Sequence, residues 1–500
     1  MTLDDLKTVD LINVVTPLTE DRTVSSLCPV CLKVIKARIF QEGEAVMIEK
    51  YCDEHGDFKD VYWSDAALYR RFMGYWPKGS DIDKPSKSLH GCPFDCGLCE
   101  NHKSGTLLGN IDVTNRCNLS CPVCFADAGD GKNEPTMDQI EFMMQVLRDQ
   151  GPIPCPAVQF SGGEPTMRVD LPEMVALAKK MGFAQIQMAS NGLILASRPD
   201  LCEKLIKNGL STVYLQFDGV TPQPYETIRG ANLLPQKLRA IENLRQAGNS
   251  SIVLVPTLVK GVNDCQVGDI VRFASDKLDL IKGINFQPVS FAGRIDQKER
   301  VAERITIPDV LALLEDQTDN EITRDDFYPV SFVEPISHLL EAETGVPQPV
   351  ITSHPCCGTA TYIYCQKGSI IPITRFIDVE GLVECMEYEA TGTCLSKFEK
   401  LKMNGRILRK IPRFIDDSQI PEGLELKKMI LNVFLKGSRE SLVDFHMNSG
   451  FLFIGVMHFQ DLYNMDLERL ERCPIHYALP DGRIIPFCSY NAYHRFNRNS

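Results

Sequence analysis

The chain has no long apolar run and no excess of positive charge. Its longest apolar stretch, 450–457, falls far short of the ~18 residues that a membrane-spanning helix needs, so we expect a core element there. The N-terminus lacks the basic and apolar regions of a secretory signal. The 53 basic and 66 acidic residues give a net charge of −13, which argues against general binding to nucleic acid.

Cysteine, in contrast, is abundant, with 19 in 500 residues. The cysteines are grouped at short, metal-type spacings, and the chain is not a small loop-rich scaffold that disulfides would staple. We therefore expect a reducing cytoplasm, with contact at a membrane surface left open. A chain of this length predicts two or three domains.

The most informative group of cysteines is Cys117, Cys121 and Cys124, in a C-x3-C-x2-C run. It directly follows a strand-like segment, 108–114. Three thiolates can hold three irons of a [4Fe–4S] cube and leave the fourth iron free to react. The spacing alone also fits a structural zinc knuckle.

A second strand-like run, 157–160, ends in Ser161-Gly162-Gly163-Glu164-Pro165. Adjacent glycines let the backbone approach a ligand closely, and a carboxylate such as that of Glu164 can pair with an ammonium group.

Together the two motifs resemble the radical S-adenosylmethionine (SAM) superfamily. The resemblance implies that Cys117, Cys121 and Cys124 carry the cluster and that its open iron chelates SAM. A 5′-deoxyadenosyl radical then abstracts hydrogen from an unactivated C–H bond. One departure is Val123, since the position before the third cysteine is usually aromatic. The residues implied to contact SAM are Gly162, Gly163 and Glu164 at its ammonium and Ser190 and Asn191 near its ribose and carboxylate.

Residues 106 to about 295 alternate between strand-like and helical patterns, which predicts parallel strands with crossover helices. The strand-like runs are 108–114, 157–161, 185–190, 213–217, 252–258 and 283–289. Six such units resemble the partial (β/α)6 barrel of radical SAM enzymes. Chemistry in such barrels lies at the C-terminal strand ends, where we expect Gln216 and Asp218 to face the mouth. Each of these polar residues could equally be an ordinary turn residue.

The predicted fold class is therefore α/β, with three regions. Residues 1–105 hold a metal-binding module and a further cysteine motif, 106–320 form the barrel, and 321–500 form a C-terminal domain with auxiliary iron–sulfur clusters.

The N-terminal region predicts a single-metal site. Cys28 and Cys31 form one C-x2-C pair, and Cys52 and His55 repeat the spacing twenty residues later, with a hairpin-like pattern between the halves. Such a set is typical of one tetrahedral zinc or iron. A cysteine from elsewhere could replace His55 as the fourth ligand.

A second C-x3-C-x2-C run, Cys92, Cys96 and Cys99, has no strand before it and no Gly-Gly-Glu-Pro after it. We interpret it as an auxiliary [4Fe–4S] site whose fourth ligand comes from the C-terminal region. The C-terminal candidates are Cys356, Cys357, Cys365, Cys385, Cys394, Cys473 and Cys488. Two complete four-cysteine clusters would use eight of these ten thiols, for three clusters in all. Cys155, Cys202 and Cys265 stand alone, and we expect them to be buried hydrophobes.

One segment, 397–413, reverses the local charge, with seven basic residues against Glu399. Apolar residues are interleaved with the basic ones. Such a segment can rest on anionic lipid head groups or bind phosphate. The simpler interpretation is a solvated helix face packed on the core.

The whole arrangement resembles the archaeal tetraether lipid synthase family. That resemblance implies C–C bond formation between the terminal carbons of two phytanyl chains on diether phospholipids, with a ferredoxin- or flavodoxin-type electron donor. The alternative is a radical SAM methyltransferase acting on a pterin precursor or another small molecule. An iron–sulfur carrier is a third possibility, but it would not need the Gly162-Gly163-Glu164 run.

Overall fold

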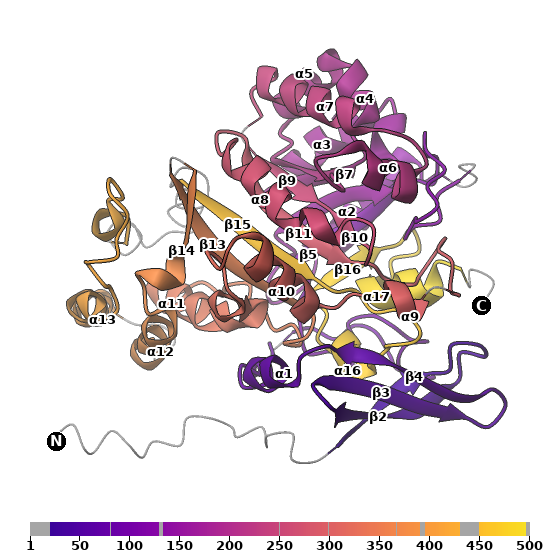
Figure 1. The fold of residues 1–500 in the computed structure, drawn as a ribbon, viewed down its shortest axis with the longest axis horizontal. Coiled ribbons are helices and arrows are strands. Elements are labelled where there is room, and N and C mark those ends of the chain that lie inside the picture. The colour runs from indigo at the N-terminus through magenta and orange to yellow at the C-terminus, as the bar shows by residue number, and fades with distance from the viewer. Residues whose placement is uncertain are drawn as a thin grey trace.

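The computed structural model describes residues 21–80, 82–129, 134–249, 251–298, 300–366, 368–390, 396–430 and 450–496. A ring of strands with helices around it forms the centre of the molecule, and a small antiparallel sheet lies against one side (Figure 1). No helix in these ranges is long and apolar enough to cross a membrane.

The N-terminal module is a four-stranded antiparallel sheet in the order β1-β2-β3-β4. Its elements are β1 (Arg22–Leu27), β2 (Val34–Glu42), β3 (Ala45–Cys52) and β4 (Gly56–Trp63), followed by α1 (Ala66–Met73). Alternate side chains, such as Ile39, Val46 and Ile48, are buried against Trp63 and Phe72, as expected of a sheet with one solvated face. The hairpin predicted between the two metal-binding pairs is formed by β2 and β3.

The large sheet is the partial barrel. In spatial order its strands are β12 (Tyr328–Pro329), β13 (Gly358–Gln366), β15 (Phe451–Met457), β11 (Ile281–Pro288), β9 (Ile252–Val255), β8 (Thr212–Gln216), β7 (Gln185–Ser190), β6 (Ala157–Gly162), β5 (Leu108–Thr114), β16 (Ile475–Ala478) and β17 (Ile484–Pro486), with β10 (Thr257–Leu258) beside β11 and β14 (Ser369–Pro372) beside β13. Neighbouring strands from β5 to β9, and β9 with β11, run parallel. The predicted (β/α)6 pattern is confirmed.

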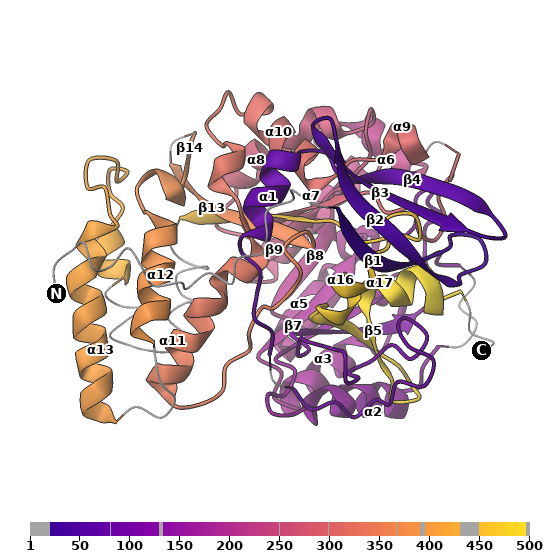
Figure 2. The same ribbon diagram turned by 90° about the horizontal axis from the view of Figure 1, so that it is seen from below.

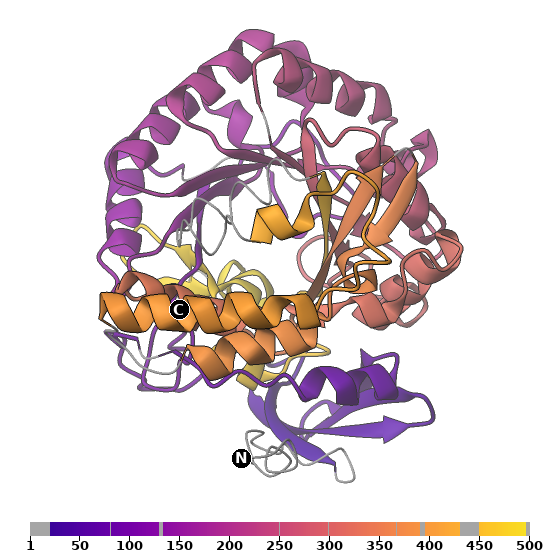
Figure 3. The same cartoon turned by 90° about the vertical axis from the view of Figure 1, so that its left-hand side faces the viewer.

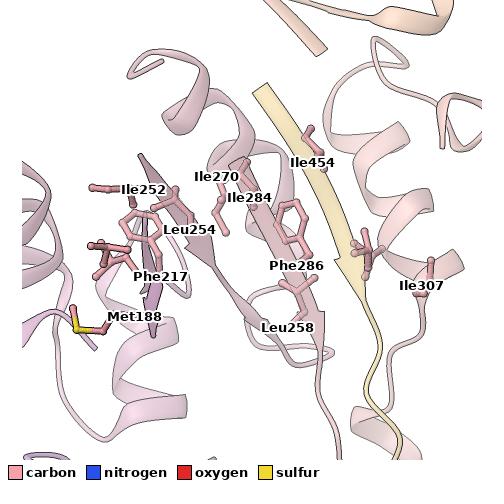
Figure 4. Packing of buried hydrophobic residues seen from close by; sticks show 14 of the residues in the cluster. Met188, Phe217, Ile252, Leu254, Leu258, Ile270, Ile284, Phe286, Ile307 and Ile454 are labelled. Carbon is pink, nitrogen blue, oxygen red and sulfur yellow. The ribbon is translucent and has the colours of Figure 1, made fainter. Parts of the chain in front are cut away.

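Helices cover the outside of this ring (Figure 3). They are α2 (Met137–Arg148), α3 (Leu171–Lys180), α4 (Leu193–Ser197), α5 (Pro199–Asn208), α6 (Pro222–Arg229), α7 (Leu234–Gln246), α8 (Val267–Ser275) and α10 (Ile307–Gln317). The outward side chains of the strands, such as Leu254, Ile284 and Ile454, pack with Ile270 and Ile307 of these helices (Figure 4). This continuous apolar layer fixes the strand ends that carry the site.

The inner wall of the barrel is largely polar. Gln159 Nε2 donates to Asn110 Oδ1 at 2.8 Å, and Gln187 Nε2 donates to Gln159 Oε1 at 3.0 Å. Tyr214 on β8 continues this row through a hydrogen bond with Gln187. On the other side of the ring, Asn285 of β11 faces Met457. The alternation of apolar outward and polar inward residues is that of strands with one face on a core and one on a lumen.

The C-terminal region does not form a separate sheet. β15 pairs in parallel with β11, and β13 pairs antiparallel with β15, while β16 pairs in parallel with β5 at the other edge. Strands from beyond residue 320 therefore extend the barrel at both edges. The predicted domain boundary at residue 320 does not separate two hydrophobic cores. Unpaired strand edges are costly, and pairing them with the same chain removes that cost.

Three further helices form a layer beside the barrel: α11 (Glu334–Thr344), α12 (Val379–Glu389) and α13 (Lys397–Lys410) (Figure 2). Met403 and Ile407 of α13 are buried in this layer. Arg406 and Lys410 pair with Glu389, whose side chain is almost fully buried. The basic segment is thus a helix packed on the core, and two of its cations are already paired.

The N-terminal module is joined to the barrel by buried charges. Arg304 Nη2 donates to Asp60 Oδ2 at 2.8 Å, and Arg304 Nη1 donates to Asp461 Oδ2 at 2.9 Å. The Arg304 side chain is only 2% exposed. Losing one partner would leave a charge unpaired in the interior, at a cost of about 3–5 kcal/mol.

Candidate functional site

The cysteines of the central motif lie on one loop, residues 115–129, here termed the cluster loop. It begins where β5 ends, at the C-terminal edge of the barrel. Cys117, Cys121 and Cys124 interact electrostatically with one another, and burial raises the pKa of Cys117 to about 11. The structure thus brings the three predicted ligands together, and metal binding would have to displace the proton from Cys117.

The C-terminal end of α6 and the loop after β11 hold the cluster loop through its backbone. Val123 N donates to Ile228 O at 3.3 Å, and Cys124 forms a reciprocal pair of bonds with Arg294, at 2.9 and 3.0 Å. A Cβ on Gly293 would lie 2.4 Å from Cys124 O, so only glycine fits there. These contacts fix the cysteine positions before any metal is bound.

The Gly-Gly-Glu-Pro run packs against the start of the same loop. Gly163 N donates to Thr114 O at 2.7 Å, and Glu164 N donates to Arg116 O at 2.8 Å. A Cβ on Gly162 or Gly163 would lie 2.2 Å from those same carbonyl oxygens. The two glycines are therefore required for close packing of one backbone segment on another, whether or not they also approach a ligand.

Glu164 is hydrogen-bonded to several residues around the predicted SAM site. It is 1% exposed. Its carboxylate accepts from Ser190 Oγ at 2.8 Å and from Asn191 N at 2.7 Å, and also from Thr166. These bonds fix the turn that follows β7. Pairing of Glu164 with the SAM ammonium stays a prediction.

Asn191 connects that turn to the cluster loop. Its Nδ2 lies 3.9 Å from Cys117 Sγ and donates to Asn118 Oδ1 at 2.7 Å. The structure therefore places Asn191 beside the cysteine loop, and contact of Ser190 and Asn191 with SAM stays a prediction.

Gln216 and Asp218 belong to a buried polar network at the end of β8. Asp218 is fully buried and binds Arg229 through both carboxylate oxygens, at 2.8 and 2.9 Å. Gln216 Oε1 accepts from Lys237 Nζ at 2.6 Å, and Lys237 also donates to Asn191 O at 2.5 Å. These groups are bonded to one another, and contact of Gln216 and Asp218 with SAM at the barrel mouth stays a prediction.

Arg229 and Lys237 were not predicted from the sequence. Arg229 ends α6 just before Gly230, and Lys237 lies on α7 among ordinary helix surface residues. One sequence signal could have identified Arg229. It is an Arg-Gly pair at the end of the helix that follows Asp218 at the end of a strand. The sequence contains no comparable signal for Lys237, because its burial depends on how α7 packs near the ends of β7 and β8.

The N-terminal module holds a well-formed single-ion site. The ligand atoms of Cys28, Cys31, Cys52 and His55 all lie within 4.8 Å of one another. Cys31 Sγ is 3.7 Å from Cys52 Sγ, and His55 Nδ1 is 3.5 Å from Cys52 Sγ. Three sulfurs and one imidazole at this spacing fit tetrahedral zinc or iron.

The second C-x3-C-x2-C run lies before β5. Cys92, Cys96 and Cys99 line one pocket together with Glu471 and Pro486 of the C-terminal region. Contact with Cys96, together with burial, raises the pKa of Cys92. C-terminal residues border these thiols, and a fourth cluster ligand from the C-terminal region stays a prediction.

Four C-terminal cysteines form a group near this pocket, of which Cys356 and Cys488 are buried and Cys357 and Cys473 are partly exposed. Cys473 and Cys488 interact with each other and with Cys357, next to Cys356. Arg469 is buried beside three of these thiols. Burial lowers the pKa of its guanidinium, but Cys357, Tyr62, Cys356 and Cys488 raise this pKa by more. A cation in this position would offset the negative charge of a thiolate-bound cluster.

The other C-terminal candidates lie apart. Cys365 follows Cys357 by eight residues of extended strand, roughly 26 Å at about 3.3 Å per residue, so it cannot share a cluster with it. Cys385 is on α12 in the helical layer, and Cys394 falls outside the described residues. Cys155 and Cys202 are buried as predicted.

Cys265, in contrast, is exposed, and the prediction that it is a buried hydrophobe is wrong. The reason is local, since Cys265 lies in a short 3-10 turn, Asp264–Gln266, before α8.

This barrel, with three cysteines on the loop after its first strand and a Gly-Gly-Glu-Pro run beside them, defines a radical SAM enzyme. The family model of the radical SAM superfamily matches residues 111–274, and that of the HMPTM N-terminal zinc ribbon domain matches residues 21–64. Members of the superfamily use a [4Fe–4S] cluster and SAM, and the zinc ribbon adds a further metal.

The chain belongs to the 7,8-dihydro-6-hydroxymethylpterin dimethyltransferase family. It is 51% identical over 481 residues to the enzyme of that name from Methanocaldococcus jannaschii, covering 95% of this chain and 94% of the relative. A probable GTP 3′,8-cyclase from Methanothermobacter marburgensis is 31% identical over 177 residues, which is 35% of this chain and 55% of that protein. Among solved structures, anSMEcpe with bound AdoMet and a peptide matches with a TM-score of 0.35 and 15% identity, over 69% of this chain and 99% of that one.

These relatives correct the expected function. The tetraether lipid synthase activity and the diether phospholipid substrate are wrong, because the near full-length relative is named for a pterin substrate. The expectation rested on the order of cysteine motifs, and that order does not distinguish a lipid from a pterin. The basic segment also gave misleading support, since Arg406 and Lys410 pair with Glu389.

Proposed function

We propose that this protein is a radical SAM methyltransferase that adds methyl groups to carbon atoms of a reduced 6-hydroxymethylpterin. The observation that carries the proposal is the 51% identity to a dimethyltransferase of that substrate over nearly the full length of both chains. The bound cluster and SAM would supply a radical able to take a hydrogen atom from a C–H bond.

The polar inner wall of the barrel supports a small heterocyclic substrate. Asn110 Nδ2 and Asn285 Oδ1 are buried and have no hydrogen-bond partner within the described part of the chain. A pterin ring presents donors and acceptors along its edge that can pair with such groups. Leaving a buried amide group unpaired costs about 1–3 kcal/mol, so occupation of these groups by a polar ring would be favourable.

The chain's own residues would divide the remaining work. Cys117, Cys121 and Cys124 would ligate the cluster, and the turn of Ser190 and Asn191 would orient SAM beside them. Glu164 would hold that turn in place. Because the cluster loop is fixed by backbone bonds, little reorganisation is needed when the ligands bind.

We further propose two auxiliary clusters. Cys92, Cys96 and Cys99 would hold one, completed by one thiol from the group of Cys356, Cys357, Cys473 and Cys488, and the other three thiols of that group would ligate the second. Buried thiols near Arg469 support this assignment. A low-potential donor of the ferredoxin or flavodoxin type would then deliver electrons.

The function is tested with anaerobically reconstituted full-length protein, SAM, a reductant and 7,8-dihydro-6-hydroxymethylpterin. Mass spectrometry should detect pterins with one and then two added methyl groups, and none with the Cys121→Ala variant. SAM labelled in its methyl group shows whether SAM is the methyl source. Formation of 5′-deoxyadenosine with no change in the pterin would contradict the proposal.

A further inference from the structure

Arg229 joins the polar network of Gln216, Asp218 and Lys237 to the middle of the cluster loop. Its Nη1 donates to Val123 O at 3.0 Å, between Cys121 and Cys124. Its Nε and Nη2 bind Asp218 at 2.8 and 2.9 Å, and Nη2 also donates to Thr257 Oγ1 at 2.9 Å. The guanidinium is therefore held in one orientation on three sides.

The charge of Arg229 faces the cysteines. Burial raises the pKa of the Cys121 thiol, whereas Arg229 lowers it through charge and a hydrogen bond. Cys124 also interacts with this guanidinium. The side chain of Arg229 is only 10% exposed, so water screens this interaction little.

The other arginines near the loop differ in this respect. Arg116 pairs with Glu134 and is 40% exposed. Arg294 holds Cys124 by backbone bonds, but its guanidinium is directed to Ala128 O. Arg168 binds Asp170 and the carbonyl oxygens of Val113 and Pro135.

We infer that Arg229 sets the reduction potential of the cluster held by Cys117, Cys121 and Cys124, with Asp218 as the residue that positions it. The inference rests on the proposed cluster assignment and is independent of the pterin substrate. A reduced cluster carries one more negative charge than the oxidised cluster. A fixed cation beside its ligands therefore favours reduction, and charge and hydrogen bonds at the sulfurs are known determinants of such potentials.

Asp218 contributes with the opposite sign. Its carboxylate partly offsets the guanidinium charge and at the same time fixes its direction. Removing the cation should therefore make the potential more negative, whereas removing the anion should make it less negative. A purely mechanical clamp would give no such difference in sign, because both variants would loosen the same loop.

The test is a redox titration of the full-length reconstituted protein, following the EPR signal that changes when SAM is added. Arg229→Gln should shift the midpoint potential to more negative values, and Asp218→Asn should shift it to less negative values. Arg229→Lys keeps the charge but not the two-pronged contact with Asp218. The midpoint potential of Arg229→Lys should therefore lie close to that of the wild type, while the variant retains less iron.

Arg168→Gln is the matched control, since Arg168 is also an acid-paired arginine with 9% side-chain exposure, and it should leave the potential unchanged. An unshifted potential in Arg229→Gln, or a shift of the same sign in Arg229→Gln and Asp218→Asn, would overturn the inference. If Arg229→Gln does not load iron, Asp218→Asn decides, and an unchanged potential there overturns it. A wild-type protein without a SAM-responsive signal would instead refute the cluster assignment.

Discussion

The two C-x3-C-x2-C motifs have the same spacing but different surroundings. The motif at Cys117 follows a barrel strand, packs against Gly163 and Glu164, and is held by Ile228 and Arg294. The motif at Cys92 precedes the first barrel strand and is bordered by C-terminal residues such as Glu471.

We infer from this difference that the cysteine spacing determines which type of cluster a motif can hold, whereas the surrounding residues determine how that cluster is used. A SAM site needs an open iron and a cradle for the ligand, and within the described residues the Gly-Gly-Glu-Pro run lies only beside Cys117–Cys124. A motif bordered by additional cysteines is suited to a fully ligated cluster. The comparison predicts that equivalent substitutions in the two motifs have different effects.

The largest effect is expected from cysteine substitutions. Cys121→Ala should abolish formation of 5′-deoxyadenosine, because the cube loses one of its three fixed ligands. Cys96→Ala should lower iron content but leave SAM cleavage in the presence of a strong reductant. For each variant, 5′-deoxyadenosine is quantified by chromatography and the iron content per chain is determined. Equal loss of SAM cleavage in the two variants would contradict the distinction between the motifs.

The single-ion site offers a contrast with both motifs. Cys31→Ser should release the metal and destabilise the N-terminal module, since binding of a structural ion contributes directly to folding. A fall of several degrees in melting temperature, with SAM cleavage per [4Fe–4S] cluster retained, is the expected result. Cys265→Ser, at an exposed thiol, serves as the control and should change neither.

A third effect tests the packing of the two backbones at the SAM site. Gly163→Ala would place a Cβ 2.2 Å from Arg116 O, so the cluster loop must move, at a cost of about 1–3 kcal/mol. We expect SAM cleavage to fall about tenfold or more, measured as initial rate.

Gly405→Ala is the matched control for that substitution. Gly405 lies within α13, and its added Cβ would meet nothing within 4 Å, so alanine should stabilise the helix by about 0.5–1 kcal/mol. Equal activity of the two variants would contradict the packing argument.

The smallest effect is a dependence of stability on pH. Burial lowers the pKa of Lys237 to about 7, although Asp218 and Glu164 raise it. The unfolded chain then binds the proton more tightly between pH 7 and the ordinary pKa of lysine, so the free energy of unfolding rises with pH in this window.

The free energy of unfolding should rise by at most about 1.4 kcal/mol per pH unit because of this one group. Denaturant unfolding of the wild type and of Lys237→Met, at pH values from 7 to 10, measures it as the difference between the two proteins. A difference that stays constant or falls with pH would show that Lys237 is not held with a lowered pKa.

Much of the fold follows from the sequence because it depends on local patterns. The strands at 108–114 and 185–190 and the metal pairs of the N-terminal module are each encoded within a few residues. The strands near 451 and 475 were not expected to join the barrel, since pairing between distant segments leaves no periodic signal.

The site shows the same division. The cysteines and the Gly-Gly-Glu-Pro run could be predicted because their chemistry is contained in their own spacing. Arg229, Lys237 and the inner wall around Asn110 depend on which elements the barrel brings together. The substrate was predicted wrongly for this reason, because the features that indicate a polar ligand are distributed over several strands.

The central claim is that the radical formed beside Cys117, Cys121 and Cys124 reacts with a reduced pterin. Its most direct test is the reaction of 7,8-dihydro-6-hydroxymethylpterin that carries deuterium at its carbon-bound positions. The account predicts that deuterium appears in 5′-deoxyadenosine, and that the Cys121→Ala variant forms none. Unlabelled 5′-deoxyadenosine from the wild-type protein, at the same yield with and without the pterin, would contradict it.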